Sequence, residues 1–480
     1  MRKTLLVLFF VFSCAMPLLA QVDTAWVRYY NGPANDLDQP SAIAVDTAGN
    51  VYVTGFCNAD VRMTGADYLT IKYYSNGDTA WTRSYNGYQD YIDQANAITA
   101  DNFGNVYVTG WSAIGKGFDY VTIKYYPNGD TAWLRRYSGP AGGYDEAYAI
   151  AVDKSGNVYV TGGSLGSGAK RMWEYATIKY DSTGNQLWVA RYKGPADSSS
   201  CGSVQGAHAI AVDDSGNVYV TGASMGEYRP PYHLTMSKGD TTFPVSISAI
   251  DLDYATVKYN SSGKQLWAGR YSGTGVYGDE ASAIALDDSG NVYVTGKSSF
   301  SGELNEYVTI RYFPNGDTAW IRKNINGHAN DIVVDDSGNA YVTGSSKGGY
   351  LTVKYYHDGS IAWARRYSGP SKGWTEAQSI ALDRSGNIYV TGYSHKTEGR
   401  VYDFNFVTIK YDTDGNQLWL VRSDGSVGRF PPTPVKIAVD NLNNVYITGE
   451  GHRDKTHTDY MTVKYIQTEK GEDKLPQIER

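Results

Sequence analysis

Cysteine is scarce in this chain of 480 residues, which contains only Cys14, Cys57 and Cys201. Small scaffolds stapled by disulfides carry many more cysteines, so a disulfide framework is excluded. Cys57 and Cys201 fall three repeat units apart in the alignment below, and we do not expect a bridge between them. An excess of basic residues is also missing, since the net charge is −7. We therefore expect no nucleic-acid partner, because phosphate binding needs a basic surface.

Long apolar runs are absent after the N-terminus, so no membrane insertion is expected. Residues 1–20 read MRKTLLVLFFVFSCAMPLLA, with a basic start, a short apolar run and a small-residue exit. This order is typical of a secretory signal peptide that is cut after Ala20. The alternative is a lipoprotein anchor at Cys14, which the bulky Phe12 disfavours. We expect an exported protein, extracellular, at the cell surface or in the periplasm.

Familiar catalytic motifs are missing as well. The sequence contains no G-x-S-x-G nucleophile elbow and no H-E-x-x-H zinc motif. The seven histidines are scattered over four repeat units, and His208 and His328 precede first strands and could face a central channel. Single histidines in such positions are more often structural or solvated than ligands. The sequence thus offers no catalytic constellation.

Glycine (53 residues) and tyrosine (42 residues) are abundant, which favours turns and half-buried strands. The phrase GNVYVTG, or a close variant, occurs eight times, 48 to 74 residues apart, and its copies end at Gly55, Gly110, Gly162, Gly222, Gly296, Gly344, Gly392 and Gly449. An apolar stretch such as AIAVD precedes each copy, and a stretch such as DYLTIKY follows it. A turn and a strand with tryptophan complete most units. Four short strands per repeat predict the blade of a β-propeller.

The tryptophan strand settles how the ring closes. It occurs after seven of the eight units, because the last unit, Ile437 to Tyr465, stops before any tryptophan. The missing strand stands at the other end of the mature chain, in DTAWVRYYNGP with Trp26. The sequence therefore predicts an all-β, eight-bladed propeller of four-stranded antiparallel blades, closed by its N-terminal strand. The expected domains are a signal peptide (1–20), the propeller (21–465) and a charged tail (466–480).

The pattern AVDxxGNVYVTG, with the following TIKY and GxxxW, resembles the seven-bladed β-propeller repeat family, also called SBBP. The resemblance covers nearly all of residues 22–465. It implies a secreted bacterial propeller of largely uncharacterised activity. The chain departs from the family name in its count, because the alignment gives eight units.

The two rims of such a ring differ. Tight DxSGN and NGD turns lie on one rim, whereas the other rim carries variable loops, the longest being Ala223 to Ile250. Variable loops on a rigid frame are where function concentrates, so we expect binding there. Acids just before first strands, with aromatic residues nearby, suit a sugar or a cation at the channel mouth; the alternative is that they are solvated or cap turns. The candidate ligand-binding residues are Asp38, Asp93, Asp145, Glu146, Asp279, Glu280, Glu376, Tyr91, Tyr144, Tyr277 and Trp374.

Two other recurrent residues are interpreted as structural. The aspartate of each DxSGN turn, such as Asp46, offers too few oxygens for a calcium loop, so it should accept amide hydrogen bonds; Ca²⁺ at these turns stays the alternative. A basic residue in each third strand, such as Lys72, should pair with an aspartate or a carbonyl oxygen of the same or an adjacent blade. The outer-strand tryptophan should pack between blades. No metal site and no cofactor are predicted.

The sequence favours a non-enzymatic binding scaffold for a protein or glycan, acting as a monomer through its variable-loop face. The alternative is an enzyme. A polysaccharide-active propeller could use the acids at the channel mouth. A quinone-cofactor dehydrogenase is the other form, because Gly184 to Trp188 and its equivalents resemble the G-x-x-x-W hairpin of those propellers. Their longer docking motif does not match here, since the aspartate of KYDSTGNQLW is misplaced by one residue.

Overall fold

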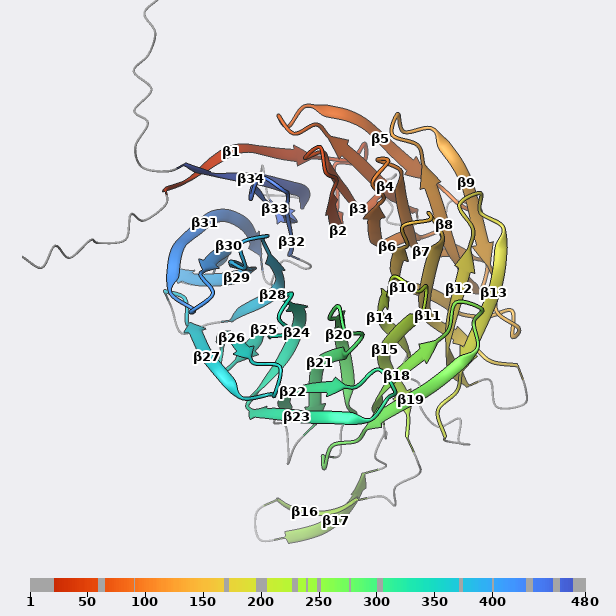
Figure 1. The fold of residues 1–480 in the computed structure, drawn as a ribbon, viewed down its shortest axis with the longest axis vertical. Coiled ribbons are helices and arrows are strands. Elements are labelled where there is room, and N and C mark those ends of the chain that lie inside the picture. Colours follow the sequence, from red (N-terminus) through yellow and green to blue (C-terminus); the bar gives the residue numbers. More distant parts are fainter. Residues whose placement is uncertain are drawn as a thin grey trace, which may run out of the picture.

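Eight four-stranded antiparallel sheets stand around a central axis in the computed structural model, as Figure 1 shows. The structure describes residues 21–58, 65–89, 91–167, 172–195, 205–226, 232–238, 241–247, 252–275, 278–299, 305–370, 374–398, 401–428, 435–451 and 458–468. These residues contain strands, turns and bends but no helix, and so none that is long and apolar enough to cross a membrane. The predicted fold class and blade number are confirmed.

The first four blades follow one another along the chain, and each begins with its innermost strand. Blade 1 is β2(Asp38–Val45), β3(Val51–Asn58), β4(Ala66–Tyr73) and β5(Thr79–Tyr85). Blade 2 is β6(Asp93–Ala100), β7(Val106–Ile114), β8(Gly117–Tyr125) and β9(Thr131–Tyr137). Blade 3 is β10(Asp145–Val152), β11(Val158–Leu165), β12(Trp173–Tyr180) and β13(Gln186–Tyr192). Blade 4 is β14(Gly206–Val212), β15(Val218–Met225), β18(Leu252–Tyr259) and β19(Gln265–Tyr271).

The next three blades repeat this order. Blade 5 is β20(Glu280–Leu286), β21(Val292–Ser299), β22(Asn305–Tyr312) and β23(Thr318–Ile325). Blade 6 is β24(Gly327–Val334), β25(Ala340–Ser346), β26(Gly349–Tyr355) and β27(Ile361–Tyr367). Blade 7 is β28(Thr375–Leu382), β29(Ile388–Glu398), β30(Val401–Tyr411) and β31(Gln417–Gly428).

Blade 8 joins the two ends of the chain. Its strands are β32(Lys436–Val439), β33(Val445–Gly451), β34(Asp459–Thr468) and, outermost, β1(Gln21–Tyr30). β1 pairs with β34 from Gln21 opposite Thr468 to Tyr30 opposite Tyr460. The predicted closure by the N-terminal strand is confirmed. β34 continues through Thr468, past the boundary predicted for the tail, because β1 offers it a pairing partner along that length.

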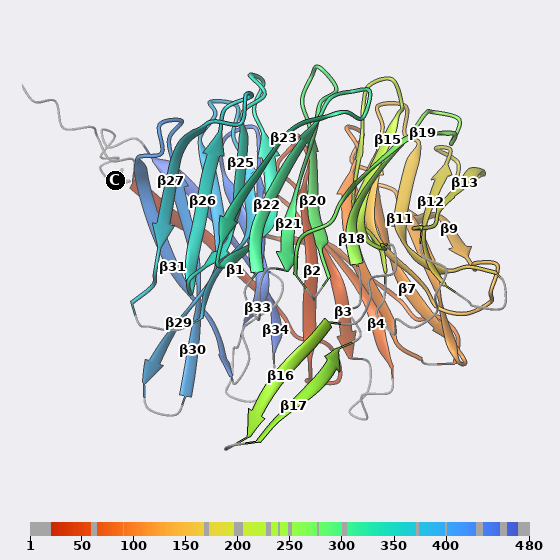
Figure 2. The same cartoon turned by 90° about the horizontal axis from the view of Figure 1, so that it is seen from below.

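Both rims are visible in Figure 2, where the tight turns form the upper rim. We call this end the tight-turn face and define it by turns such as 46–50 and 74–78. The opposite end is the loop face, defined by links such as 31–37 and 138–144. Below it lies the hairpin β16(Tyr232–Lys238) and β17(Thr241–Ile247), which forms in the longest predicted insertion and which the sequence reading missed.

The tight turns follow from their sequence. The Oδ1 atom of Asp46 accepts the backbone N–H groups of Ala48 and Asn50, both at 2.9 Å, and its Oδ2 atom accepts the hydroxyl of Tyr52 at 2.8 Å. Gly49 follows at φ 76°, a conformation that L-residues with side chains adopt at a cost. The predicted turn role of this aspartate is confirmed. In blade 8, Asn443 takes the glycine position at φ 62°.

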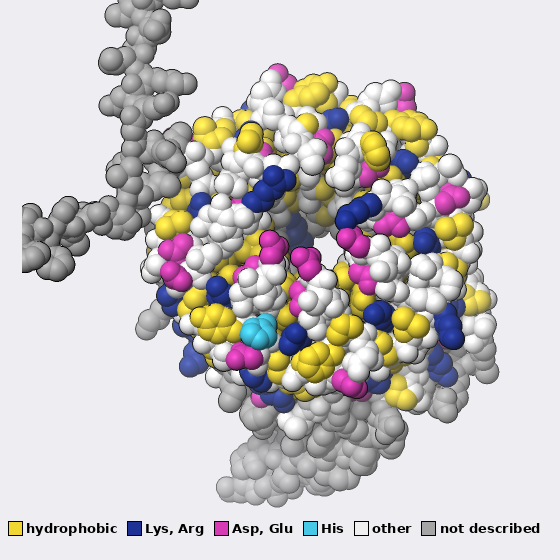
Figure 3. All heavy atoms as spheres, viewed as in Figure 1, with side chains coloured by type: hydrophobic (Ala, Val, Ile, Leu, Met, Phe, Trp, Pro, Cys, Tyr) yellow, Lys and Arg dark blue, Asp and Glu magenta, His cyan; other side chains and the backbone are white. Residues whose placement is uncertain are grey.

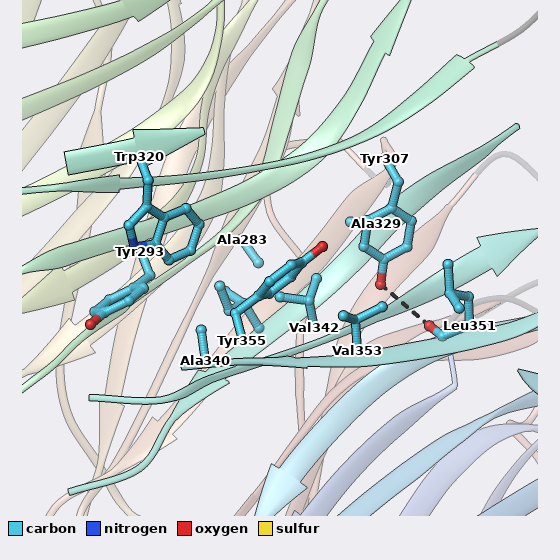
Figure 4. Close-up of a cluster of buried hydrophobic side chains, with 11 residues drawn as sticks. Ala283, Tyr293, Tyr307, Trp320, Ala329, Ala340, Val342, Leu351, Val353 and Tyr355 are labelled. Carbon is cyan, nitrogen blue, oxygen red and sulfur yellow. Dashed lines mark hydrogen bonds between the residues drawn. The ribbon is translucent and has the colours of Figure 1, made fainter. Parts of the chain in front are cut away.

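The core lies between blades rather than within them. In the cluster of Figure 4, Tyr293 and Trp320 of blade 5 lie against Ala340 and Val342 of blade 6. These residues expose 0 to 7% of their surface, so each blade junction buries a continuous apolar layer. In five blades the buried tyrosine hydroxyl of the third strand donates to a carbonyl oxygen of the next blade, as Tyr307 does to Leu351 at 3.3 Å.

A second contact ties the outer edges together. The Lys72 ammonium and the Trp81 indole N–H of blade 1 both donate to the carbonyl oxygen of Pro127 in the turn of blade 2, at 2.9 and 3.1 Å. The predicted pairing of the recurrent basic residue and the predicted packing of the tryptophan are confirmed. Six equivalent pairs share one acceptor: Lys124 with Trp133, Lys179 with Trp188, Lys258 with Trp267, Arg311 with Trp320, Lys354 with Trp363, and Lys464 with Trp26.

Candidate functional site

The four aspartates among the predicted site residues are buried at the loop face. Asp38, Asp93 and Asp145 expose 0% of their surface and Asp279 exposes 4%. Each carboxylate accepts the backbone N–H of a glycine six residues earlier; Gly139 donates to Asp145 at 2.7 Å. They therefore close the link between one blade and the next. In blade 4 the same place is taken by Gln205, which binds the backbone N–H of Met225.

Burial shifts the acidity of these groups. It raises the pKa of Asp38 to about 7, helped by the charges of Asp459 and Asp36 and opposed by the Gly32 amide. Burial also raises the pKa of Asp93, Asp145 and Asp279, although their hydrogen bonds pull it down. The placement of these carboxyl groups indicates a structural role in the links.

The three predicted glutamates stand one residue later in the register. Glu146, Glu280 and Glu376 pair across β10–β11, β20–β21 and β28–β29 with Gly163, Lys297 and Tyr393. Successive residues of a strand point to opposite faces, so these side chains diverge from the buried aspartates. Their strands are innermost in the ring, and the Glu280 and Glu376 side chains stay 34% and 22% exposed.

Hydrogen bonds and ion pairs link these glutamates around the inner edge of the ring, and we call the set the inner belt. Glu280 accepts from Lys297 at 2.8 Å and lies 3.2 Å from His208 of blade 4. The hydroxyl of Tyr148 donates to Glu146 at 2.7 Å, and its ring meets His208 edge-on, with centroids 5.4 Å apart.

The inner belt continues in blades 6 and 7. Glu376 lies 3.1 Å from the His328 ring nitrogen and accepts from the Asn330 amide at 2.8 Å. The hydroxyl of Tyr393 donates to the other oxygen of Glu376 at 3.0 Å. Glu280 and Glu376 are thus each held by partners from two blades, whereas Glu146 is held by Tyr148 of its own blade.

The three carboxyl groups of the inner belt have pKa values that are shifted in different directions. Burial raises the pKa of Glu146, and the Tyr148 bond only partly offsets that. Burial also acts on Glu280, but the charges of His208 and Lys297 outweigh it and hold its pKa below the usual range. The pKa of Glu376 is lowered in the same way by its bonds to His328, Asn330 and Tyr393.

Aromatic rings stand on the loop face, where Tyr144 and Trp374 come directly before the innermost strands β10 and β28. The Trp111 ring contacts the Phe118 ring at a tilt of 59°, with centroids 4.5 Å apart, and Phe118 meets Tyr144 at 5.3 Å. Tyr144 is 43% exposed, and Tyr91 of the link before blade 2 is 37% exposed. The predicted Trp374 is 64% exposed beside blade 7. The predicted Tyr277 lies outside the described residues.

The structure also bears on metals. Among the residues that the structure describes, no group of three or more His, Cys, Asp and Glu side chains could hold a metal ion. Cys57 is buried and free, and Cys201 lies outside the described residues.

The chain is similar in sequence to one family of repeat proteins. The SBBP beta-propeller repeat matches residues 25–58, 81–116, 133–168, 270–302, 328–350 and 362–397, and five of these six segments run from the outermost strand of one blade into the inner strands of the next. The chain is an SBBP repeat protein. No curated protein sequence matches it.

Solved propeller structures match this SBBP protein at low identity. The Dos1 propeller is 8% identical over 92% of this chain and 94% of that chain, with a TM-score of 0.49. A protein of unknown function from Dyadobacter fermentans is 7% identical over 94% of this chain and 100% of that chain, with a TM-score of 0.42. A second such protein, from Bacteroides caccae, is 12% identical over 66% and 94%, with a TM-score of 0.32.

The sequence reading of this SBBP protein missed Tyr148, Lys297, Asn330 and Tyr393. A signal for two of them was present, because the residue directly after each GNVYVTG phrase breaks the repeat. That position holds Phe56, Trp111, Gly163, Ala223, Lys297, Ser345, Tyr393 and Glu450. The strand sequence is otherwise nearly the same in all eight blades, so a position that varies between blades is one whose residue the fold does not determine.

Proposed function

We propose that this SBBP repeat protein is an exported, non-enzymatic recognition scaffold that binds a glycan at the inner edge of its loop face. One observation carries the proposal: the exposed rings of Tyr144 and Trp374 come two residues before Glu146 and Glu376, whose carboxylates the inner belt holds in place. A sugar offers an apolar ring face together with hydroxyl groups, and this combination of side chains matches both.

The aromatic part is the cluster of the Trp111, Phe118 and Tyr144 rings across blades 2 and 3, which meet at tilted angles. Rings in mutual contact keep their orientation, so a flat ligand meets a surface that needs little ordering. Gln94 stands opposite Trp111 in the β6–β7 register, on the same side of the sheet. An amide beside a ring provides both a donor and an acceptor for sugar hydroxyls.

The carboxylate part is Glu280 and Glu376. Both carry a lowered pKa and therefore stay charged near neutral pH, where they accept hydroxyl hydrogen bonds. Their existing partners, His208 and His328, fix their positions in advance. A binding role fits this arrangement better than nucleophilic attack, because every carboxylate is already engaged.

A second candidate function is cleavage of a polysaccharide. It is favoured by the contrast between Glu146, whose pKa burial raises, and Glu280, whose pKa is lowered. Glycosidases use one protonated and one ionised carboxyl group, and environments that push two pKa values apart are how such pairs arise. Turnover of a bound glycan would favour this candidate over a scaffold.

The test is a glycan array probed with the purified protein, followed by titration and a reducing-end assay on each hit. We expect binding without release of new reducing ends. Trp111→Ala and Tyr144→Ala should each weaken binding about tenfold or more, as the loss of an exposed stacking ring does. Tyr356→Ala is the matched control, since Tyr356 is 47% exposed on the opposite face. Binding of a protein but no glycan would overturn the proposed ligand class.

Export rests on residues 1–20, which the structure does not describe. The test is expression of the full chain in a bacterial host with fractionation and N-terminal sequencing of the product. We expect release from the cytoplasm and a new terminus at Gln21. A lipid-modified terminus at Cys14 would instead assign the protein to a membrane surface.

A further inference from the structure

An arginine closes five of the eight blade junctions at the tight-turn face. It stands two residues after the outer-strand tryptophan, and the five are Arg28, Arg83, Arg135, Arg322 and Arg365. The Nε–H of each donates to the carbonyl oxygen of the turn glycine in the next blade, at 2.5 to 2.7 Å. The guanidinium carbon lies 5.4 to 5.8 Å from the centroid of its own tryptophan ring. At each of these junctions, the glycine carbonyl oxygen and the tryptophan ring together bind one guanidinium group. We call this pair of groups the cradle.

Two adjacent junctions keep the cradle but have no arginine. Ala190 follows Trp188 at the junction of blades 3 and 4, and Gly269 follows Trp267 at the junction of blades 4 and 5. The turn glycines opposite them lie as close to the indoles as elsewhere in the ring. A Cβ atom built on Gly263 or Gly316 would stand 2.7 Å from Trp188 or Trp267, against 2.8 Å between Gly77 and Trp26.

Of the seven blade junctions that have an outer turn, these two have a more exposed turn glycine and tryptophan than the other five. The turn glycine is buried wherever an arginine covers it, whereas Gly263 and Gly316 are partly exposed. Trp188 and Trp267 are partly exposed as well, and the tryptophans of the five arginine junctions expose 7%. Leu187 and Leu266 beside them are 53% and 50% exposed. The missing guanidinium thus leaves an indole face and a carbonyl group accessible to solvent.

Charge around the second junction suits a cation. Asp317 directly follows Gly316, whereas Lys264 follows Gly263, so the Trp267 site should be the stronger. On the channel side of the same junction, Asp214 and Asp288 are exposed beside a hollow of about 680 Å³ that also includes Pro314 and Lys258, and Asp214 pairs with Lys154 at 2.8 Å. Figure 3, which views the tight-turn face, shows acidic side chains together with lysine and arginine side chains around the central opening.

We propose that Trp188 with Gly263, and Trp267 with Gly316, form two guanidinium-binding sites for an arginine-bearing segment of a protein partner. A guanidinium can donate to the glycine carbonyl while it stacks on the indole, as the five internal arginines do. A lysine ammonium offers a point charge without the planar fork, so it fits this cradle less well. The inference concerns the face opposite the glycan proposal and does not depend on it.

The test uses three short peptides that differ only at two positions, which carry arginine, lysine or the uncharged arginine isostere citrulline. Binding is followed on the indole N–H signals in ¹⁵N-labelled protein, assigned with Trp188→Phe and Trp267→Phe. We expect the arginine peptide to shift the signals of Trp188 and Trp267 and to leave those of Trp26, Trp81 and Trp133 in place. The lysine peptide should bind several-fold more weakly, and the citrulline peptide should not bind.

The matched variants introduce an arginine into the chain itself, so that its side chain occupies the cradle. Ala190→Arg places the side chain that five other blades already carry, and should abolish the shift at Trp188. Gly269→Arg should do the same at Trp267, although its Cβ must displace the Tyr312 ring, 2.8 Å away. Val421→Arg is the control, because blade 8 has no outer turn to complete a cradle with blade 7.

Three outcomes would overturn the proposal. Equal binding of the citrulline and arginine peptides would exclude charge recognition. Indole shifts that survive in the Ala190→Arg and Gly269→Arg variants would place the peptide elsewhere. Self-association in sedimentation runs that these two variants remove would assign the sites to a second copy of the chain rather than to a partner.

Discussion

Trp26 and Lys464, from opposite ends of the chain, lie in register across β1 and β34 and donate to one acceptor, the Ser75 carbonyl oxygen, at 3.2 and 2.9 Å. The Ser75 carbonyl oxygen of blade 1 thus binds both the first strand of the chain, β1, and the last, β34. At the junction before it, between blades 7 and 8, no outer turn exists, because the chain ends interrupt it. Lys410 there contacts the side-chain oxygen of Gln467 instead. The closure is therefore asymmetric, and its two sides differ in a way that substitutions can measure.

Trp26→Phe should destabilise the ring more than Trp419→Phe. Both changes remove a similar indole volume from a 6 to 7% exposed site. Trp26 also loses its bond to Ser75, whereas the Trp419 N–H finds no acceptor among the described residues. Losing a satisfied bond costs about 1 kcal/mol, and removing an unsatisfied buried N–H relieves a penalty. Urea unfolding of both variants gives the comparison, and equal midpoints would contradict it.

Asp38 should make stability fall as pH rises. Its pKa is about 7 in the folded chain and about 3.9 when exposed, so the folded state holds the proton more tightly between these values. This contribution is fully present below pH 4 and is lost as pH rises through 7. Asp38→Asn should flatten that part of the unfolding free-energy profile by on the order of a few kcal/mol. Asp336→Asn, at an exposed turn position, is the control and should leave the slope unchanged.

The pair of His208 and Glu280 can be titrated directly. Burial holds the pKa of His208 below its usual value, and the charge of Glu280 pulls it back up. Glu280→Gln should therefore lower the pKa of His208 further, by about one unit, as the loss of a close opposite charge does. Imidazole signals followed by NMR across pH 4 to 8 measure this shift. His357, exposed on the opposite face, serves as the reference and should not move.

Much of the fold could be predicted because each blade repeats the same local chemistry. Asp46 and Gly49 encode their turn within five residues, and the displaced Trp26 strand reveals the closure. The inner belt could not be predicted, because its partners, such as His208 and Glu280, come from different blades. Asp145 points into the buried link and Glu146 points to the other face of the sheet, because they are successive residues of β10. Which of the two is buried depends on the strand register, next to a bulge between Ala147 and Ala149. A sequence pattern does not locate such a bulge.

The turn glycines provide a last prediction, which separates backbone strain from packing. Gly49 adopts φ 76°, and a Cβ there would meet its nearest neighbour at 3.4 Å, an ordinary contact. Gly49→Ala should therefore cost only the left-handed backbone strain, about 1 to 2 kcal/mol. Asn443 holds the equivalent place in blade 8 at φ 62°, so Asn443→Gly should be neutral or slightly stabilising. Calorimetric unfolding of both variants checks the pair. A larger loss for Asn443→Gly would mean that the asparagine side chain, rather than its backbone tolerance, holds that turn.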